Sequence, residues 1–587
     1  MQEEHIRYYD LIVLFLELFT SCGPASKGVR NIQTKVNQMT EVTSDMIASA
    51  ERLFGVEYSA EERELMIGNF EGQILSALER RKSSFPNALP MASRFDPRLP
   101  GFVPPRQPAS GNWSLPDPGP LPETDEDIAF ASVTQQAEWI RLGKLTSSRL
   151  TEIYLDRIER LGAKLECFVT VTPELARAEA AAADAQIKAG VWLGPLHGIP
   201  YGLKDLFDTK GIRTSWGATP YKDQVPEQDA RIVQMLRAAG AVLLGKTTLG
   251  ALAYGDIWFD GKTRNPFNLD EGSSGSSAGS ASATAAGLCG FSIGTETLGS
   301  ITSPSQRCGT TGLRPTFGRI SRAGGMALCW SLDKIGPICR AVEDCALVLA
   351  AINGGDPADR SSIDAPFGFS PDATTDGMRV GYLPAAFEDE GATEVDHAAL
   401  EAMRGLSVEV VPVSLPDLPY GSLMAILFAE AAAAFEELTL SDRDDELVWQ
   451  DPGAWPNAFR KARFLSAVDH VQLDRLRYQV MQALDDIFSQ VDAMIGPFMT
   501  GPMLVATNFT GHPCLHLRAG FLESETRSDP SLAHGKLVVE EKGEAPQTFR
   551  IPQGISLWGG LFDEARLITL GRALEAKLGV AAERPAL

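Results

Sequence analysis

Residues 270–305 are the stretch whose residue types could do chemistry, and they read DEGSSGSSAGSASATAAGLCGFSIGTETLGSITSPS. Serine, glycine and alanine dominate this stretch as they do in a flexible linker, yet a linker has no use for the apolar cluster at 288–293. A serine hydroxyl is a poor nucleophile unless a base removes its proton during the attack. The stretch therefore raises the question of which serine, if any, has such a base.

Two short motifs suggest serine chemistry, and both lack the context that they need. Gly275 to Gly279 fits the G-x-S-x-G nucleophile elbow, but turn-forming sequence precedes it instead of the buried strand that an elbow requires. Ser331 to Lys334 fits the S-x-x-K motif of penicillin-recognising enzymes, but no Lys-Thr-Gly motif accompanies it. A plain flexible loop without any catalytic serine is a third interpretation.

A larger set of motifs resembles the amidase signature family, the Ser–cisSer–Lys hydrolases. These motifs are LHGIPYGLKDLFDTKG at 196–211, GSSAGSASATAAG at 275–287, GTETLGSITSPS at 294–305 and CGTTGLRPTFGRISRAG at 308–324. The resemblance runs from about Thr146 to the C-terminus. It implies an α/β fold, in which a large mixed central β-sheet lies between layers of α-helices, and an amide hydrolase that forms an acyl-enzyme.

The same resemblance implies roles for individual residues. Ser300, last in TETLGS, matches the nucleophile; Ser276 matches the bridging serine after a cis peptide bond; and Lys204 matches the base. An oxyanion hole would be formed by the backbone N–H groups of Thr297, Leu298, Gly299 and Ser300.

A lysine that serves as the base must be uncharged. Free lysine has a pKa of about 10.4, so activity near neutral pH requires a strongly lowered pKa at Lys204. Burial away from carboxylates can lower it. Asp205 is the next residue and would oppose this change if its carboxylate faced the amine. We therefore expect the Asp205 side chain to face elsewhere and to be structural.

The sequence departs from the commonest family text at two positions near Ser300. Leu298 stands where the family usually has glycine, and its side chain restricts the backbone if that position needs a positive φ. Thr302 stands where an arginine is often found. The loss of this cation favours substrates that are not acidic, and neutral drift on the pocket wall is the alternative explanation.

The substrate pocket is expected to be built partly from variable segments. We expect Met326, Trp330 and Trp455 to line it, and the tryptophans indicate an apolar or aromatic acyl or amine group. Packing of the same aromatic side chains in the core is an equally open interpretation.

Three functions agree with these residues. The first is a stand-alone amidase for a small-molecule amide, which would also accept anilides, esters or carbamates because their tetrahedral intermediates share one geometry. The second is the glutaminase A-type subunit of a tRNA-dependent amidotransferase, which GLRPTFGRISRAG resembles. The third is a non-catalytic binding protein on a degenerate hydrolase fold. The complete set of three polar residues favours an enzyme, and the N-terminal extension favours the first function.

The elements that must position these groups follow from hydrophobic patterning. Residues 125–587 alternate amphipathic helices with short apolar strands, such as Ala241 to Leu244, as expected for the catalytic domain. Residues 1–85 are predicted to be a helical N-terminal extension, in which Ser59 and Glu62 have capping-box spacing.

The segment 86–124 has a different composition, with eleven prolines, and is predicted to be a linker or wrapping arm. For the N-terminal extension, a packed appendage, a dimerisation element and an active-site cover are the open interpretations. The apolar run Leu11 to Phe19 has an acidic flank and is interrupted by Glu17, so we expect an amphipathic helix of a cytoplasmic protein rather than a targeting segment.

Composition argues against several other classes of protein. A formal charge of −23 disfavours nucleic acid or an anionic membrane as a partner. The eight cysteines form no C-x-x-C pair, and the seven histidines form no H-E-x-x-H motif, so reduced thiols and no metal site are expected. We expect no cofactor, and a homodimer is an alternative to a monomer.

Overall fold

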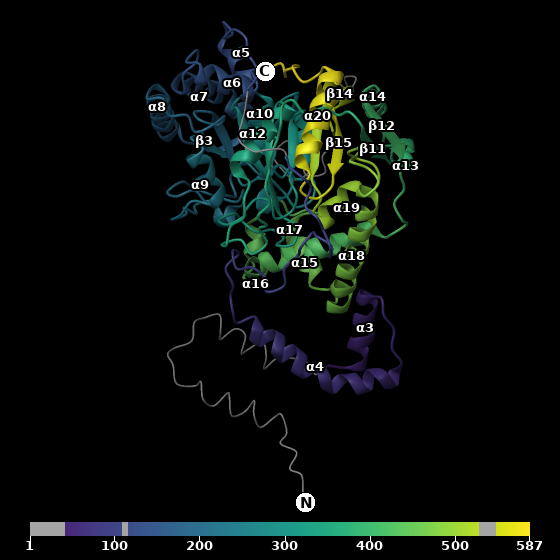
Figure 1. Ribbon diagram of the computed structural model, residues 1–587. Helices are drawn as coiled ribbons and strands as arrows, with labels where there is room; N and C mark the ends of the chain where they lie inside the picture. The colour runs from purple at the N-terminus through teal and green to yellow at the C-terminus, as the bar shows by residue number, and fades with distance from the viewer. Residues whose placement is uncertain (1–41, 108–114, 528–546) are drawn as a thin grey trace, which may run out of the picture. The chain divides into compact units, whose positions relative to one another are not determined.

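The computed structural model describes residues 42–107, 115–527 and 547–587. The chain divides into two compact units, Met1–Pro86 and Asn87–Leu587 (Figure 1). The apolar run at 11–19 lies outside the described residues. None of the described helices has both the length and the apolar character needed to cross a bilayer.

Two helices make up the described part of the first unit, α3 (Ser44–Phe54) and α4 (Ala60–Arg80). The predicted capping box at the start of α4 is confirmed: Glu62 N–H donates to Ser59 Oγ at 3.2 Å, and Ser59 N–H donates to Glu62 Oε2 at 2.7 Å. An ion pair of 2.7 Å between Arg63 and Glu51 joins the two helices.

An eleven-stranded mixed β-sheet forms the centre of the second unit. Its strands are β1 (Phe168–Val171), β2 (Pro200–Lys204), β3 (Val242–Thr247), β8 (Phe291–Glu296), β9 (Thr311–Arg314), β10 (Lys334–Cys339), β11 (Met378–Tyr382), β12 (Val408–Pro412), β13 (Ala493–Pro497), β14 (Cys514–Glu525) and β15 (Thr548–Gly559). They lie in the order β1-β3-β2-β8-β10-β9-β14-β15-β13-β11-β12. The expected α/β fold with a large mixed sheet is therefore confirmed.

Short ribbons and many helices surround this sheet (Figure 1). The ribbons are β4 (Ile257–Trp258) with β5 (Gly261–Lys262), and β6 (Arg264–Asn265) with β7 (Asn268–Gly272). The α-helices are α5 (Asp125–Phe130), α6 (Val133–Arg141), α7 (Ser147–Leu165), α8 (Pro173–Lys188), α9 (Arg231–Ala238), α10 (Ala278–Ala285), α11 (Thr302–Cys308), α12 (Val342–Ile352), α13 (Pro384–Glu388), α14 (Glu394–Arg404), α15 (Met424–Ala434), α16 (Glu436–Leu440), α17 (Trp455–Ala462), α18 (Ala467–Phe488), α19 (Met503–Thr510) and α20 (Glu564–Leu578).

Helices cover both faces of the sheet. Adjacent residues of a strand point to opposite faces, so Leu515 and His516 mark the two faces at β14. Leu515 lies against Gly571 of α20, where a Cβ would not fit. Gly312 of β9 lies opposite His516 on the neighbouring strand and therefore belongs to the same face. A Cβ at Gly312 would meet Ser305 of α11 on that face. Helices α20 and α11 therefore lie on opposite faces.

The strands next to the candidate site are buried almost throughout. Strands β2, β3 and β10 are buried at every position, as expected for strands covered on both faces. The predicted strand Ala241 to Leu244 is displaced: β3 begins at Val242 and continues to Thr247. Hydropathy misses the last part because Lys246 and Thr247 are polar but still pair with β1 and β2.

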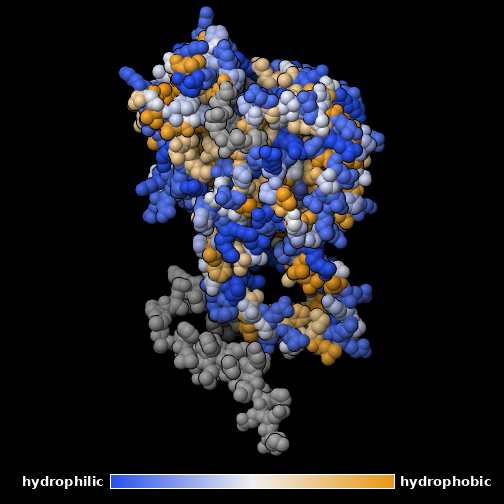
Figure 2. Space-filling view, viewed as in Figure 1, coloured by the Kyte–Doolittle hydropathy of each residue, from blue (hydrophilic) through white to orange (hydrophobic). Residues whose placement is uncertain are grey.

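Segment 87–107 and residues 115–124 contain neither helix nor strand. Prolines favour such backbone because they fix φ and lack an N–H group. On the face of the second unit that Figure 2 shows, hydrophilic residues predominate and hydrophobic ones are interspersed among them.

Candidate active site

Lys204 is the last residue of β2, and its side chain is completely buried. Its Nζ lies 2.8 Å from Ser276 Oγ, 3.0 Å from Ser277 Oγ and 2.8 Å from Thr295 Oγ1. Among the described residues, no carboxylate forms an ion pair with it. Burial lowers the pKa of Lys204 well below its usual range, although the charges of Asp333 and Glu296 act in the opposite direction. The amine is thus placed among hydroxyls, where burial favours its neutral form.

Asp205 faces away from this amine, as predicted. Its Oδ2 accepts the Ser215 N–H at 2.8 Å, and its Oδ1 lies 3.4 Å from Nζ of Lys246 on β3. Lys246 is also completely buried and donates to the carbonyl of Phe207 at 2.7 Å. The Asp205 carboxylate therefore forms a separate buried ion pair with Lys246 and makes no ion pair with Lys204.

The loop before α10 brings Ser276 to Lys204. The Gly275–Ser276 peptide bond is cis, as the resemblance implied, and Ser276 is completely buried. A Cβ on Gly275 would lie 1.9 Å from the carbonyl oxygen of Gly255, so only glycine fits there. The Ser277 N–H donates to the carbonyl of Ser300 at 3.1 Å, which holds the two serine segments side by side.

The turn Thr297–Ser300 follows β8 and carries the expected nucleophile. Ser300 is 7% exposed, and within the described ranges its hydroxyl makes no hydrogen bond. The main-chain N–H groups of these four residues likewise donate to no protein acceptor in the described part of the chain. Such N–H groups are free to bind the oxygen of a substrate carbonyl.

The concern about Leu298 is resolved by the backbone of this turn. Gly299 has a φ of +79°, whereas Leu298 is absent from the residues with positive φ. The left-handed conformation thus falls on the glycine, and a side chain at Leu298 is compatible with the turn.

Glu296 fixes the two ends of the turn. Its Oε2 accepts the N–H groups of Ile301 and Thr302, both at 2.9 Å, and its Oε1 accepts from Arg314 at 2.8 Å and from Asn508 at 3.0 Å. Burial acts to raise the pKa of Glu296, but the charge of Arg314 and the N–H donors outweigh it, and the pKa falls to about 2. The Thr302 hydroxyl also donates to Glu296, at 3.1 Å, so the threonine side chain belongs to the hydrogen-bond network of Glu296.

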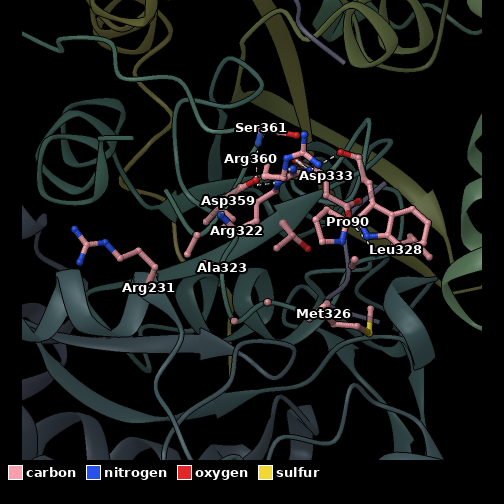
Figure 3. A pocket seen from close by; sticks show the side chains of 18 of the residues that line it. Pro90, Arg231, Arg322, Ala323, Met326, Leu328, Asp333, Asp359, Arg360 and Ser361 are labelled. Atoms are coloured by element: carbon pink, nitrogen blue, oxygen red, sulfur yellow. Dashed lines mark hydrogen bonds and ion pairs between the residues drawn. The ribbon is translucent and has the colours of Figure 1, made fainter. Parts of the chain in front are cut away.

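A cavity of about 510 Å³ lies beside Thr295 and Thr297, and Lys204, Ser276 and Ser300 are not among its lining residues (Figure 3). Thr295, which contacts Lys204, and Thr297 both line it. Met326 and Trp330 line this cavity, and Trp455 is not among its lining residues. The Trp455 indole donates to the carbonyl of Leu252 at 3.0 Å and its ring stacks on Phe459, which is the core-packing alternative.

Charged side chains in the cavity wall near the turn already have partners within the protein. Asp333 accepts from the Thr297 hydroxyl at 2.6 Å and from the N–H groups of Leu328 and Cys329. Arg322 is paired with Asp359 at 3.0 Å, and Figure 3 shows both beside Asp333. Arg322 is therefore neutralised by Asp359, whereas Asp333 is held by uncharged donors.

Sequence reasoning missed Ser277 and Thr295 as partners of Lys204. Strand pairing supplies the missing information, because β2 lies parallel to β8 with Leu203 opposite Ile293. The available signal was a threonine next to Glu296 at the end of the strand. The serine of the S-x-x-K motif is engaged elsewhere: the Ser331 hydroxyl donates to Glu430 at 2.5 Å.

In the described ranges, no group of three or more His, Cys, Asp or Glu side chains could hold a metal ion. His512 and His516 each face a hydroxyl, of Thr510 at 2.8 Å and of Ser556 at 3.0 Å. Burial lowers the pKa of both histidines to about 3.

Comparison with known proteins gives one consistent family. The model of the Amidase family matches residues 149–567. The A-type subunit of the glutamyl-tRNA(Gln) amidotransferase of Roseiflexus sp. (strain RS-1) is 35% identical over 474 residues, which is 76% of this chain and 96% of the relative. The peptide amidase of Stenotrophomonas maltophilia superposes with a TM-score of 0.64 at 28% identity, over 77% of this chain and 98% of that chain. A bacterial aryl acylamidase, 21% identical with a TM-score of 0.66 over 78% of this chain and 100% of its own, shares the fold.

Proposed function

The chain belongs to the amidase family, and on that premise we propose that it is an amide hydrolase with Ser300 as nucleophile, Ser276 as proton relay and Lys204 as base. The observation that carries the proposal is the environment of Lys204. Burial lowers the pKa of this amine, which contacts hydroxyls and no carboxylate, and so favours the uncharged form that can accept a proton.

The proposed reaction has two halves. In the first, Ser300 attacks the carbonyl while its proton passes to Ser276 and the proton of Ser276 passes to Lys204. The N–H groups of the Thr297–Ser300 turn receive the oxyanion. The C–N bond then breaks, and the amine leaves with a proton from Ser276, which is replaced from Lys204. In the second half, water hydrolyses the acyl ester through the same relay and restores Ser300.

We propose neutral small-molecule amides and anilides as the substrate class, with esters and carbamates as further substrates. The support is the cavity wall, where Met326 and Trp330 are apolar and Arg322 is paired with Asp359. A binding role for Trp455 stays a prediction.

The proposed catalytic domain spans 125–587, with 1–85 as a helical extension and 86–124 as a linker or wrapping arm. We propose that the chain acts without a cofactor, nucleic acid or membrane. A homodimer remains the alternative to a monomer.

A second candidate is the glutaminase component of a tRNA-dependent amidotransferase. The observation in its favour is the 35% identity to a protein named as the A-type subunit of such an enzyme. Glutaminase activity together with a stable complex with a second, tRNA-binding protein would favour this candidate over a stand-alone amidase.

Ser300→Ala tests the assignment of the nucleophile. We expect loss of hydrolysis of p-nitroacetanilide and of labelling by a fluorophosphonate probe, which reacts with activated serines. Ser305→Ala is the matched control, because Ser305 is also buried on the following helix and its hydroxyl has no partner among the described residues. Labelling that persists in Ser300→Ala contradicts the assignment, and a wild-type chain that neither reacts nor turns over any amide favours a non-catalytic binding protein.

A further inference from the structure

Residues 87–95, here named the strap, lack regular structure but are tied to the catalytic unit by specific contacts. Asn87 Nδ2 donates to the carbonyl of Ala327 at 2.8 Å, and Asn87 Oδ1 accepts the Ala327 N–H at 2.8 Å. Nδ2 also donates to the carbonyl of Ala434 at 3.3 Å. One side-chain amide thus uses both its donor and its acceptor on the backbone of a single residue, which lies between Met326 and Leu328 of the cavity wall.

The other end of the strap is held by Arg94 and Phe95. Arg94 donates to the carbonyl of Arg360 at 3.0 Å, and Arg360 donates to the carbonyl of Met91 at 3.5 Å. The Phe95 ring lies 5.2 Å from the ring of Phe317. The guanidinium of Arg477 lies 3.4 Å from the centre of the Phe95 ring, which is a cation–π contact.

Between these two anchors the strap forms one wall of the 510 Å³ cavity. Figure 3 draws Pro90 together with Leu328 and Asp333 among the side chains that line the cavity. The strap residues that line the cavity are Ala88, Pro90, Met91, Ser93, Arg94 and Phe95. Leu89 is not among them, and its side chain is 49% exposed.

The strap lies outside the part of the chain that the family model matches, which begins at residue 149. The rest of the cavity wall near the turn, from Thr295 to Trp330, lies within that part. The strap is therefore a part of this cavity wall that the family model does not match.

We propose that the strap is a specificity element, which limits the length of the substrate group that the cavity accepts. This inference rests on the proposed function. Proline fixes φ, and the contacts at both ends restrict movement, so a longer group cannot displace the strap without breaking hydrogen bonds. The substrates selected are amides whose acyl or amine group is compact enough to end at Met91 and Pro90.

Two series of substrates measure this limit on the purified full-length chain. One series lengthens a straight acyl chain on p-nitroaniline from acetyl to decanoyl, and the other lengthens the N-alkyl group of an acetamide. For the wild type we expect kcat/KM to fall sharply beyond one chain length in the series whose variable group occupies the cavity. Met91→Ala should move this fall in kcat/KM to longer chains. For the shortest chain that the wild type hydrolyses poorly, this variant should raise kcat/KM by about tenfold. Met91→Trp should move the fall to shorter chains.

Leu89→Ala is the matched control, because it removes a similar side chain from the same strap outside the cavity. Asn87→Ala is a second variant, which releases one anchor while the cavity residues stay intact. We expect it to accept longer chains with a gradual rather than a sharp limit.

The outcomes separate the two proposals. Chain-length profiles that coincide for the wild type, both Met91 variants and Asn87→Ala overturn the specificity role of the strap while the hydrolase stands. A shift that Leu89→Ala reproduces also overturns it. A wild-type chain that hydrolyses no substrate and does not react with a fluorophosphonate contradicts the proposed function, and the strap proposal falls with it.

Discussion

Two lysines on neighbouring strands have the same burial and different partners. Lys204 on β2 and Lys246 on β3 are both completely buried, and burial lowers the pKa of both. Lys246 has a carboxylate, Asp205, at 3.4 Å, whereas Lys204 has the hydroxyls of Ser276, Ser277 and Thr295. Burial alone therefore does not make a base. A carboxylate turns a buried amine into half of an ion pair, and hydroxyls leave it ready to take a proton.

The largest expected effect is the loss of the proposed base. Lys204→Met keeps an unbranched side chain of similar length but removes the amine, so kcat/KM for an anilide should fall on the order of 10⁴-fold. Steady-state kinetics and circular dichroism on the same sample check it. A variant that retains more than a tenth of wild-type activity would remove Lys204 from the mechanism.

Lys246→Met should act on stability instead. It leaves Asp205 as an uncompensated buried carboxylate, which costs about 3–5 kcal/mol of unfolding free energy. Urea denaturation measures this loss, and Asp205→Asn in the same chain should recover part of it. Equal loss of stability in Lys204→Met would mean that the two amines do not differ as we describe.

The acid limb of the pH profile reports the charge of Lys204. The proposed base must be neutral to accept a proton. The value of kcat/KM should therefore be low at pH values below the lowered pKa of Lys204 and should rise as the pH passes through it. The charge of Asp333 acts to raise this pKa, so Asp333→Asn should move the acid limb to lower pH, by less than about one pH unit. Lys246→Met is the control and should leave the limb where it is. An acid limb that moves to higher pH in Asp333→Asn contradicts this account.

The smallest effect is expected at Leu298. Because its φ is not positive, Leu298→Gly should change kcat by less than about threefold and cost about 0.5–1 kcal/mol of stability through backbone entropy. The acid limb of the pH profile should not move in Leu298→Gly, because this variant leaves Lys204 unchanged. Gly299→Ala is the contrasting variant, because its φ of +79° disfavours any side chain, and its kcat should fall further.

Much of the fold can be predicted from hydrophobic patterning and from the family resemblance. Where the prediction is wrong, the cause is local. The rhythm of helix, glycine and apolar strand indicated a sheet covered by helices, and the structure has one. The end of β3 was placed too early because Lys246 and Thr247 are polar. Their burial comes from pairing with other strands, which hydropathy along the chain does not contain.

The candidate site could be predicted by residue type but only partly by arrangement. Lys204, Ser276 and Ser300 came from the motifs, and the structure brings their segments together, whereas Ser277 and Thr295 depend on the pairing of β2 with β8. A linker or wrapping arm was predicted at 86–124, but the contacts that anchor the strap could not be predicted. Its anchor joins Asn87 to Ala327 across 240 positions, and a proline-rich sequence carries no periodic signal for such a contact.

One carboxylate has a consequence for how small a substrate can be. Glu296 holds the start of α11 to the end of β8 and joins both to β9 and α19 through Arg314 and Asn508. The four N–H groups between these fixed points are in position before any molecule arrives, so a ligand need not contribute contacts elsewhere to assemble them. Formamide or acetamide should therefore still be cleaved, weakly bound but with an intact rate for the bound molecule.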